Sequence, residues 1–131
     1  MLEFDRNFFP EPRTAFLKAW VSQPGTISLG ASKGSKLSAY GVLRPCRVGF
    51  KIGPLFADSS ELAEAIFAGL RQHVPVGAPC YLDVPACNPQ ALALAARHGM
   101  KPAFETARMY LGPAPDLSLE RTYGITSFEL G

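Results

Sequence analysis

Three basic residues of this sequence lie in segments that are predicted to be strands, where their side chains could bind an anion. Arg44, Lys51 and Arg108 are the three examples. Strand alternation places Tyr40 and Arg44 on one face. If that face lines a cleft, the Arg44 guanidinium could hold a carboxylate or phosphate with two parallel hydrogen bonds. The alternative is that these residues face solvent.

Two carboxylates could remove a proton from a reacting group. Asp83 and Glu105 are candidate general bases, although either could equally be a surface or ion-paired carboxylate. The three cysteines, Cys46, Cys80 and Cys87, show no metal-ligand spacing, and with only two histidines we expect no metal site. Free thiols of this kind suit a reducing cytoplasm, which is where we expect the protein.

Composition limits the class of protein. The chain has 131 residues, of which 47% are hydrophobic and 18% charged, so we expect one globular domain over 1–131. The formal net charge of +2 is too small to indicate a nucleic-acid partner. No apolar run is long enough to span a membrane, and we expect no membrane association.

The elements that position these residues follow from periodicity and from turn residues. Apolar spacing predicts helices over about 11–22 and 58–74, the second with capping-box spacing between Asp58 and Glu61. Strands are predicted on both sides of a Gly34-Ser35 turn and over 47–57, 78–85, 102–112 and 121–130. A further helix begins with Asn88 as its cap and Pro89 at its first position, and it ends at Gly99.

The order of these elements predicts an α/β (α+β) fold. A strand–helix–strand unit requires a parallel pair, whereas the flanking hairpins are antiparallel. We therefore expect a mixed, mostly antiparallel sheet with helices on both faces.

The stretch Leu82-x-Val84-x-x-x-Asn88-x-x-Ala91, followed by a helix ending at Gly99-Met100, resembles the GNAT family of N-acetyltransferases. The element order is similar over most of the chain. More narrowly, "GPLFAD", "ETARMY" and "FELG" resemble segments of the C-terminal GNAT-like domain of two-domain bacterial acetyltransferases. By this resemblance, the chain lacks the first strand and first helix of the family.

The resemblance implies that acetyl-CoA lies in a cleft where two neighbouring parallel strands splay apart. It also implies a set of site residues. The cofactor would be bound by Phe56, Ala57, Ser59, Ser60 and Asn88, although Asn88 could act as a helix cap alone. Tyr110 and Glu105 would be catalytic, and Arg44, Asp83 and Arg108 would bind the acceptor substrate.

Three departures from the family pattern stand against this assignment. The glycine-rich diphosphate loop is replaced by Ala57-Asp58-Ser59-Ser60-Glu61-Leu62, which places carboxylates where a phosphate would bind. The family's catalytic tyrosine position is Ala95, and only Tyr40 and Tyr110 are candidate substitutes. The missing first strand would expose a sheet edge, which we expect a second copy or another domain to cover.

Two functions from different classes therefore remain. One is acetyl transfer from acetyl-CoA to a primary amine, on a small molecule or a protein. The other is a non-catalytic GNAT-like domain that dimerises or regulates a catalytic partner. A third, weaker hypothesis is a small-ligand sensor that uses Arg44 and Arg108.

Overall fold

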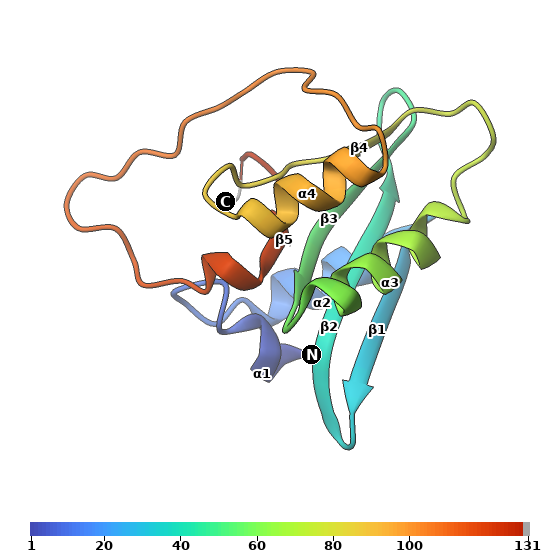
Figure 1. The fold of residues 1–131 in the computed structure, drawn as a ribbon. Helices are drawn as coiled ribbons and strands as arrows, with labels where there is room; N and C mark the ends of the chain where they lie inside the picture. The colour runs from blue at the N-terminus through green and yellow to red at the C-terminus, as the bar shows by residue number, and fades with distance from the viewer. Residues whose placement is uncertain (130–131) are drawn as a thin grey trace.

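A mixed sheet forms the centre of the computed structural model, which describes residues 1–129 (Figure 1). Two helices, α1 (Leu2–Asp5) and α2 (Thr14–Val21), precede a meander of β1 (Ile27–Lys33), β2 (Lys36–Pro45) and β3 (Phe50–Ala57). Helix α3 (Ser60–Arg71) then leads to β4 (Cys80–Leu82), and α4 (Pro89–Arg97) follows. After a long loop, a short 3-10 helix, η1 (Leu119–Arg121), leads into β5 (Thr122–Gly124).

The sheet has the strand order β1-β2-β3-β4, with β5 also paired to β3. The β1–β2 and β2–β3 pairs are antiparallel, whereas β3 and β4 are parallel and joined through α3. This confirms the predicted mixed sheet and the predicted parallel pair. The predicted helix over 11–22 is confirmed as the shorter α2, while α1 was not predicted.

Each face of the sheet has its own apolar cluster. Helices α3 and α4 cover one face, where Leu43, Leu55 and Phe67 are almost completely buried. The N-terminal segment and α2 cover the other face, where Phe8, Tyr40 and Phe56 are buried together. Helices on both faces were predicted, and the structure confirms them.

The C-terminal part of the prediction is partly wrong. Residues 102–110, within the strand predicted over 102–112, form neither helix nor strand. The strand predicted over 121–130 is only the three-residue β5, and it pairs with β3 instead of forming a hairpin with 102–112. Residue 130 lies outside the described residues. A strand needs a neighbouring backbone to satisfy its hydrogen bonds, and β3 supplies this partner to β5.

Helix α3 packs so closely on β2 that a side chain at Gly41 would collide with its neighbours. A Cβ atom at Gly41 would lie 2.8 Å from Ile66 Cγ2 and 2.9 Å from Leu70 Cδ1. Both neighbours belong to the buried cluster. These side chains would have to shift within the packed core to accommodate even one methyl group.

We predict that Gly41→Ala lowers the free energy of unfolding by about 1–3 kcal/mol through overpacking. Urea denaturation measures the change. The control is Ser32→Ala, at an exposed position of β1, which should change stability by less than about 0.5 kcal/mol. Equal stability of the Gly41→Ala variant and the unmodified chain would contradict this packing.

Candidate functional site: the wedge between β3 and β4

A wedge opens between β3 and β4 because the two strands pair over only three residues. Their register runs from Phe50 opposite Cys80 to Ile52 opposite Leu82. At the next two residues, Gly53 and Pro54, β3 forms a bulge against β2. Proline has no N–H to donate, so the ladder is interrupted at the point where β4 leaves it.

The chain's own segment 122–127 fills this wedge. Strand β5 pairs antiparallel with β3 on the side that β4 has left, with Leu55 opposite Gly124. The Ile125 N–H donates to the Asp83 carbonyl oxygen at 3.0 Å, which ties the segment to the end of β4. A Cβ atom at Gly53 would lie 2.7 Å from the carbonyl oxygens of Ile125 and Thr126, so glycine allows this close approach.

Asn88 holds the beginning of the segment. Its side-chain oxygen accepts from the N–H groups of Gln90 and Ala91, which confirms it as the cap of α4. Its side-chain amide donates to the carbonyl oxygen of Thr122 at 2.9 Å and also to those of Leu119 and Glu120. Asn88 is only 2% exposed. Both ends of its side chain are therefore engaged within the chain.

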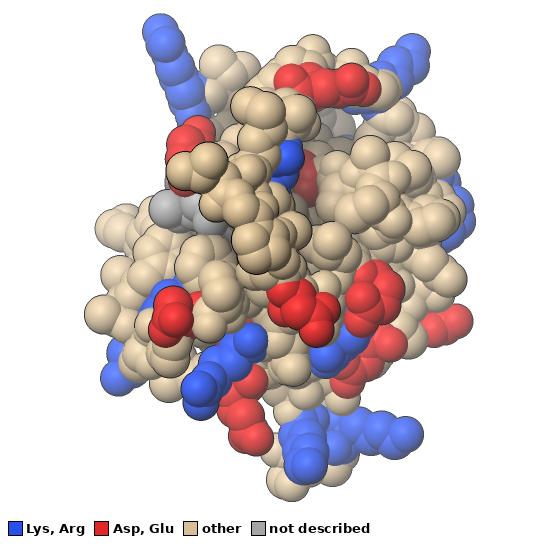
Figure 2. Space-filling view, turned by 90° about the vertical axis from the view of Figure 1, so that its left-hand side faces the viewer, with Lys and Arg blue, Asp and Glu red and all other residues tan. Residues whose placement is uncertain are grey.

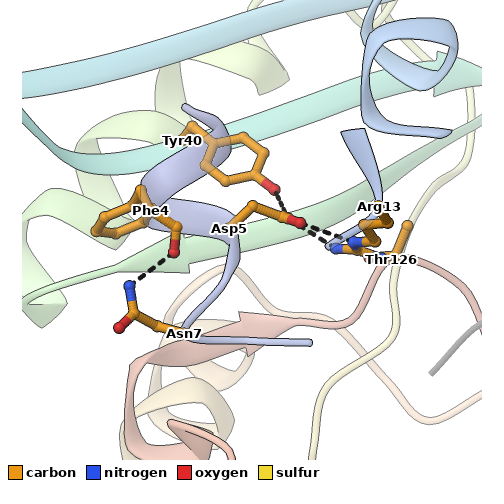
Figure 3. A network of polar contacts seen from close by, with 6 residues as sticks. All are labelled: Phe4, Asp5, Asn7, Arg13, Tyr40 and Thr126. Carbon is orange, nitrogen blue, oxygen red and sulfur yellow. Dashed lines mark hydrogen bonds and ion pairs between the residues drawn. The ribbon is translucent and has the colours of Figure 1, made fainter. Parts of the chain in front are cut away.

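A buried polar network holds the other end of the segment (Figure 3). Arg13 forms a two-pronged ion pair with Asp5, with both contacts at 2.8 Å, and it also donates to Thr126 Oγ1 at 3.2 Å. The Tyr40 hydroxyl donates to Asp5 at 2.5 Å. Burial, followed by the Asp5 charge, raises the pKa of Tyr40 far above its usual value. Tyr40 thus acts as a neutral donor inside the core.

The N-terminus of α3, where the family resemblance implies a diphosphate, is engaged by the chain's own groups. The N-cap is Ser59, whose hydroxyl accepts from the Leu62 N–H, so the predicted capping role of Asp58 is wrong. Asp58 instead pairs with Arg121, next to β5, at 2.5 Å. Hydrogen bonding, chiefly from the Ser59 hydroxyl, lowers the pKa of the Glu61 carboxyl below its usual value. The charged carboxylate of Glu61 thus occupies this helix end.

Four further predicted site residues are distributed over the wedge and the core. Phe56 and Ala57 are buried, and the Phe56 ring stacks on Phe8 with the ring centroids 4.0 Å apart. Asp83 is buried in an ion pair with Lys51. Burial raises the pKa of the Asp83 carboxyl, although the charge of Lys51 opposes the shift. Arg44 packs its guanidinium on the ring of Trp20, 4.9 Å from the ring centroid.

Ser60, also predicted to bind the cofactor, is the first residue of α3 and is half-buried. The last three predicted site residues, Glu105, Arg108 and Tyr110, lie in the long loop before η1 and are exposed. Arg108 lies beside the Tyr110 ring, with its guanidinium carbon 5.9 Å from the ring centroid. Arg44, in contrast, packs on α2, so the two arginines of the sensor hypothesis lie in different surroundings. The structure therefore does not bring the predicted catalytic, cofactor and substrate residues into one cleft.

Two open hollows lie on the surface, and neither is lined by residues of β3, β4 or segment 122–127. One, of about 230 Å³, is lined by the N-terminal segment, including Glu3, Asp5, Arg6 and Arg13. The other, of about 320 Å³, is lined by Arg6, Asn7 and residues 116–118 and 120. Among residues 1–129, no group of three or more His, Cys, Asp or Glu side chains could hold a metal ion. Within the same residues, no helix is long and apolar enough to cross a membrane.

Sequence reasoning missed the residues that anchor the segment: Asp5, Arg13, Arg121 and Thr126. Each has an ordinary polar side chain in an unremarkable local sequence, and their partners are distant along the chain. Arg13 and Thr126, for example, are 113 positions apart. No spacing rule could have paired them.

Comparison with known proteins agrees with the fold. A family model described as an acetyltransferase (GNAT) domain matches residues 1–124. Holothin acyltransferase from Pseudoalteromonas sp. (strain SANK 73390) is 28% identical over 131 residues, which is all of this chain and 45% of that protein. A crystal structure of a proposed acetyltransferase from Pyrococcus horikoshii superposes with a TM-score of 0.72 at 26% identity, over 99% of this chain and 42% of that one. The chain thus spans less than half the length of either protein.

We predict that Asn88→Ala lowers the free energy of unfolding by about 3 kcal/mol, from a lost cap and from buried carbonyl groups left without a donor. Asn88→Asp keeps the capping oxygen but loses the amide, so it should destabilise about as strongly. Urea denaturation measures both variants.

Ser59→Ala, which removes only the cap of α3, is the matched control and should cost about 1 kcal/mol. If Asn88→Asp were as stable as the unmodified chain, Asn88 would be a helix cap only, and its contact with segment 119–122 would contribute nothing.

Proposed function

Because the chain belongs to the GNAT acetyltransferase family, we propose that it is a GNAT-fold domain of an acyltransferase that does not itself hold acetyl-CoA in the wedge. In this proposal, it acts as a non-catalytic domain that supports a catalytic partner. The observation that carries the proposal is the burial of segment 122–127 between β3 and β4.

The residues present do not fit acetyl-CoA in this arrangement. GNAT domains in general use acetyl-CoA, and the family resemblance places it in the wedge. Here β5 takes up the edge of β3 at Leu55 and Phe56 that the cofactor would need. A diphosphate at the N-terminus of α3 would lie next to the carboxylates of Asp58 and Glu61, and the like charges would repel each other.

The two residues assigned as catalytic, Glu105 and Tyr110, also lie outside the wedge. Ala95 stands where the resemblance expects a tyrosine, and Tyr40 is buried in its bond to Asp5. Glu105 and Tyr110 lie in the exposed loop. A proton-transferring group must come within hydrogen-bond reach of the reacting atoms, and among the described residues no side-chain or backbone hydrogen bond joins either of these two residues to segment 122–127.

A second candidate is amine acetylation by this domain itself after segment 122–127 has left the wedge. One observation favours it. Strand β5 is only three residues long and follows a loop whose residues 101–116 are not held by backbone hydrogen bonds within the described part of the chain. Acetyl-CoA would then compete with the segment for the edge of β3.

Calorimetric titration with acetyl-CoA at low salt separates the two proposals. The non-catalytic proposal predicts no heat of binding up to about 1 mM ligand, which corresponds to a binding free energy weaker than about −4 kcal/mol. A GNAT protein that binds acetyl-CoA, measured in the same buffer, is the positive control. Micromolar binding would overturn the proposal and would favour the second candidate.

A further inference from the structure

A strand-like segment without a partner lies in the long loop between α4 and η1. Phe104 is 67% exposed, Met109 is 87% exposed, and Leu111 is fully exposed. Within residues 1–129, residues 101–116 neither donate nor accept a backbone hydrogen bond. The residue types of 104–111 nevertheless favour a strand, which is why a strand was predicted there. An apolar, unpaired segment of this kind is typical of an interaction surface.

The position of the segment leaves its backbone accessible. The loop arches away from the sheet on the side opposite β1 (Figure 1). The view onto this side shows uncharged side chains over much of the surface, with acidic and basic groups scattered among them (Figure 2). The Phe104 ring contacts Phe128, with the centroids 5.1 Å apart, at one end of the segment. The rest of the segment is available to a partner.

The sequence of the segment is complementary to itself. If two copies pair as antiparallel strands about a two-fold axis, residues that face each other point to the same side of the sheet. The axis must therefore pass midway between one residue and the same residue of the other copy. With the axis at Ala107, Phe104 of each copy lies opposite Tyr110 of the other copy, so the dimer contains two such aromatic pairs. Cross-strand aromatic pairs of this kind stabilise a sheet.

Neighbouring registers are less favourable. An axis at Glu105 or at Arg108 would place two like charges directly opposite each other, which destabilises a strand pair. An axis at Thr106 would separate the aromatic rings and place Phe104 opposite Arg108. The small side chain of Ala107, in contrast, allows close approach at the axis.

We propose that residues 104–111 of two copies of this chain pair as antiparallel strands about a two-fold axis at Ala107, forming a weak homodimer. The pairing closes on itself, because each copy contributes the same segment. The surface lies outside the wedge, so the inference does not rest on the proposed function, and the titration with acetyl-CoA does not test it.

The solution mass tests the proposal. Analytical ultracentrifugation of the unmodified chain should show a monomer that becomes a dimer as its concentration rises to about 0.5 mM, as expected for a small interface. Ala107→Lys places two lysines opposite each other at the axis and should give a monomer throughout. The control Ala114→Lys adds the same charge at another exposed position of the loop and should leave the dimer intact.

A cross-link tests the register. In a Cys87→Ser background, which removes the exposed native thiol, Ala107→Cys should form a disulfide-linked dimer on mild oxidation, since Cα atoms facing each other in a strand pair are within disulfide range. Ala114→Cys in the same background should form several-fold less disulfide-linked dimer.

The proposal is overturned by a monomeric mass at every concentration, by equal masses of the two lysine variants, or by equal cross-linking of the two cysteine variants. A dimer that persists in Ala107→Lys would assign the contact to another surface, such as the open edge of β1.

Discussion

The backbone of β3 imposes the main constraint on this fold. Beyond Ile52, β3 continues next to β2, but β4 has left its other side. Leu55 and Phe56 lie deep in the molecule, where backbone N–H and C=O groups must find partners. Segment 122–127 supplies them. The Asn88 amide and the Arg13–Asp5–Tyr40 network hold its two ends, so distant parts of the chain combine to fill one gap in the sheet.

This gap is also where the proposed non-catalytic role departs from the family pattern. The mixed sheet, the parallel β3–β4 pair and the cap of α4 all agree with a GNAT fold. The family resemblance, however, implies that acetyl-CoA would need an open wedge and a helix end that accepts phosphate. In this chain, β5 fills the wedge, and the Asp58–Arg121 pair and Glu61 lie at the N-terminus of α3. A fold alone does not establish a function.

Local signals in the sequence were enough to predict most of the fold. The Asn88-Pro89 pair predicted the start of α4, and Gly34 predicted the turn between β1 and β2. Both predictions succeeded because these residues act through their own backbone conformation. The partner of β5 could not be predicted, since the residue types of both 102–112 and 121–130 favour a strand and only tertiary packing decides which segment pairs. The candidate site failed for a similar reason. Asn88 was identified as a cap, but the contacts of its amide depend on residues more than thirty positions away.

Amide hydrogen exchange, measured residue by residue with and without about 1 mM acetyl-CoA, tests the occupied wedge most directly. The account predicts that the Ile125 amide, bonded to the Asp83 carbonyl oxygen, exchanges far more slowly than the amides of the loop over 101–116. It also predicts that acetyl-CoA changes neither rate. Loop-like exchange at Ile125, together with new protection of Leu55 and Phe56 on adding acetyl-CoA, would contradict it and show that the wedge is a cofactor site.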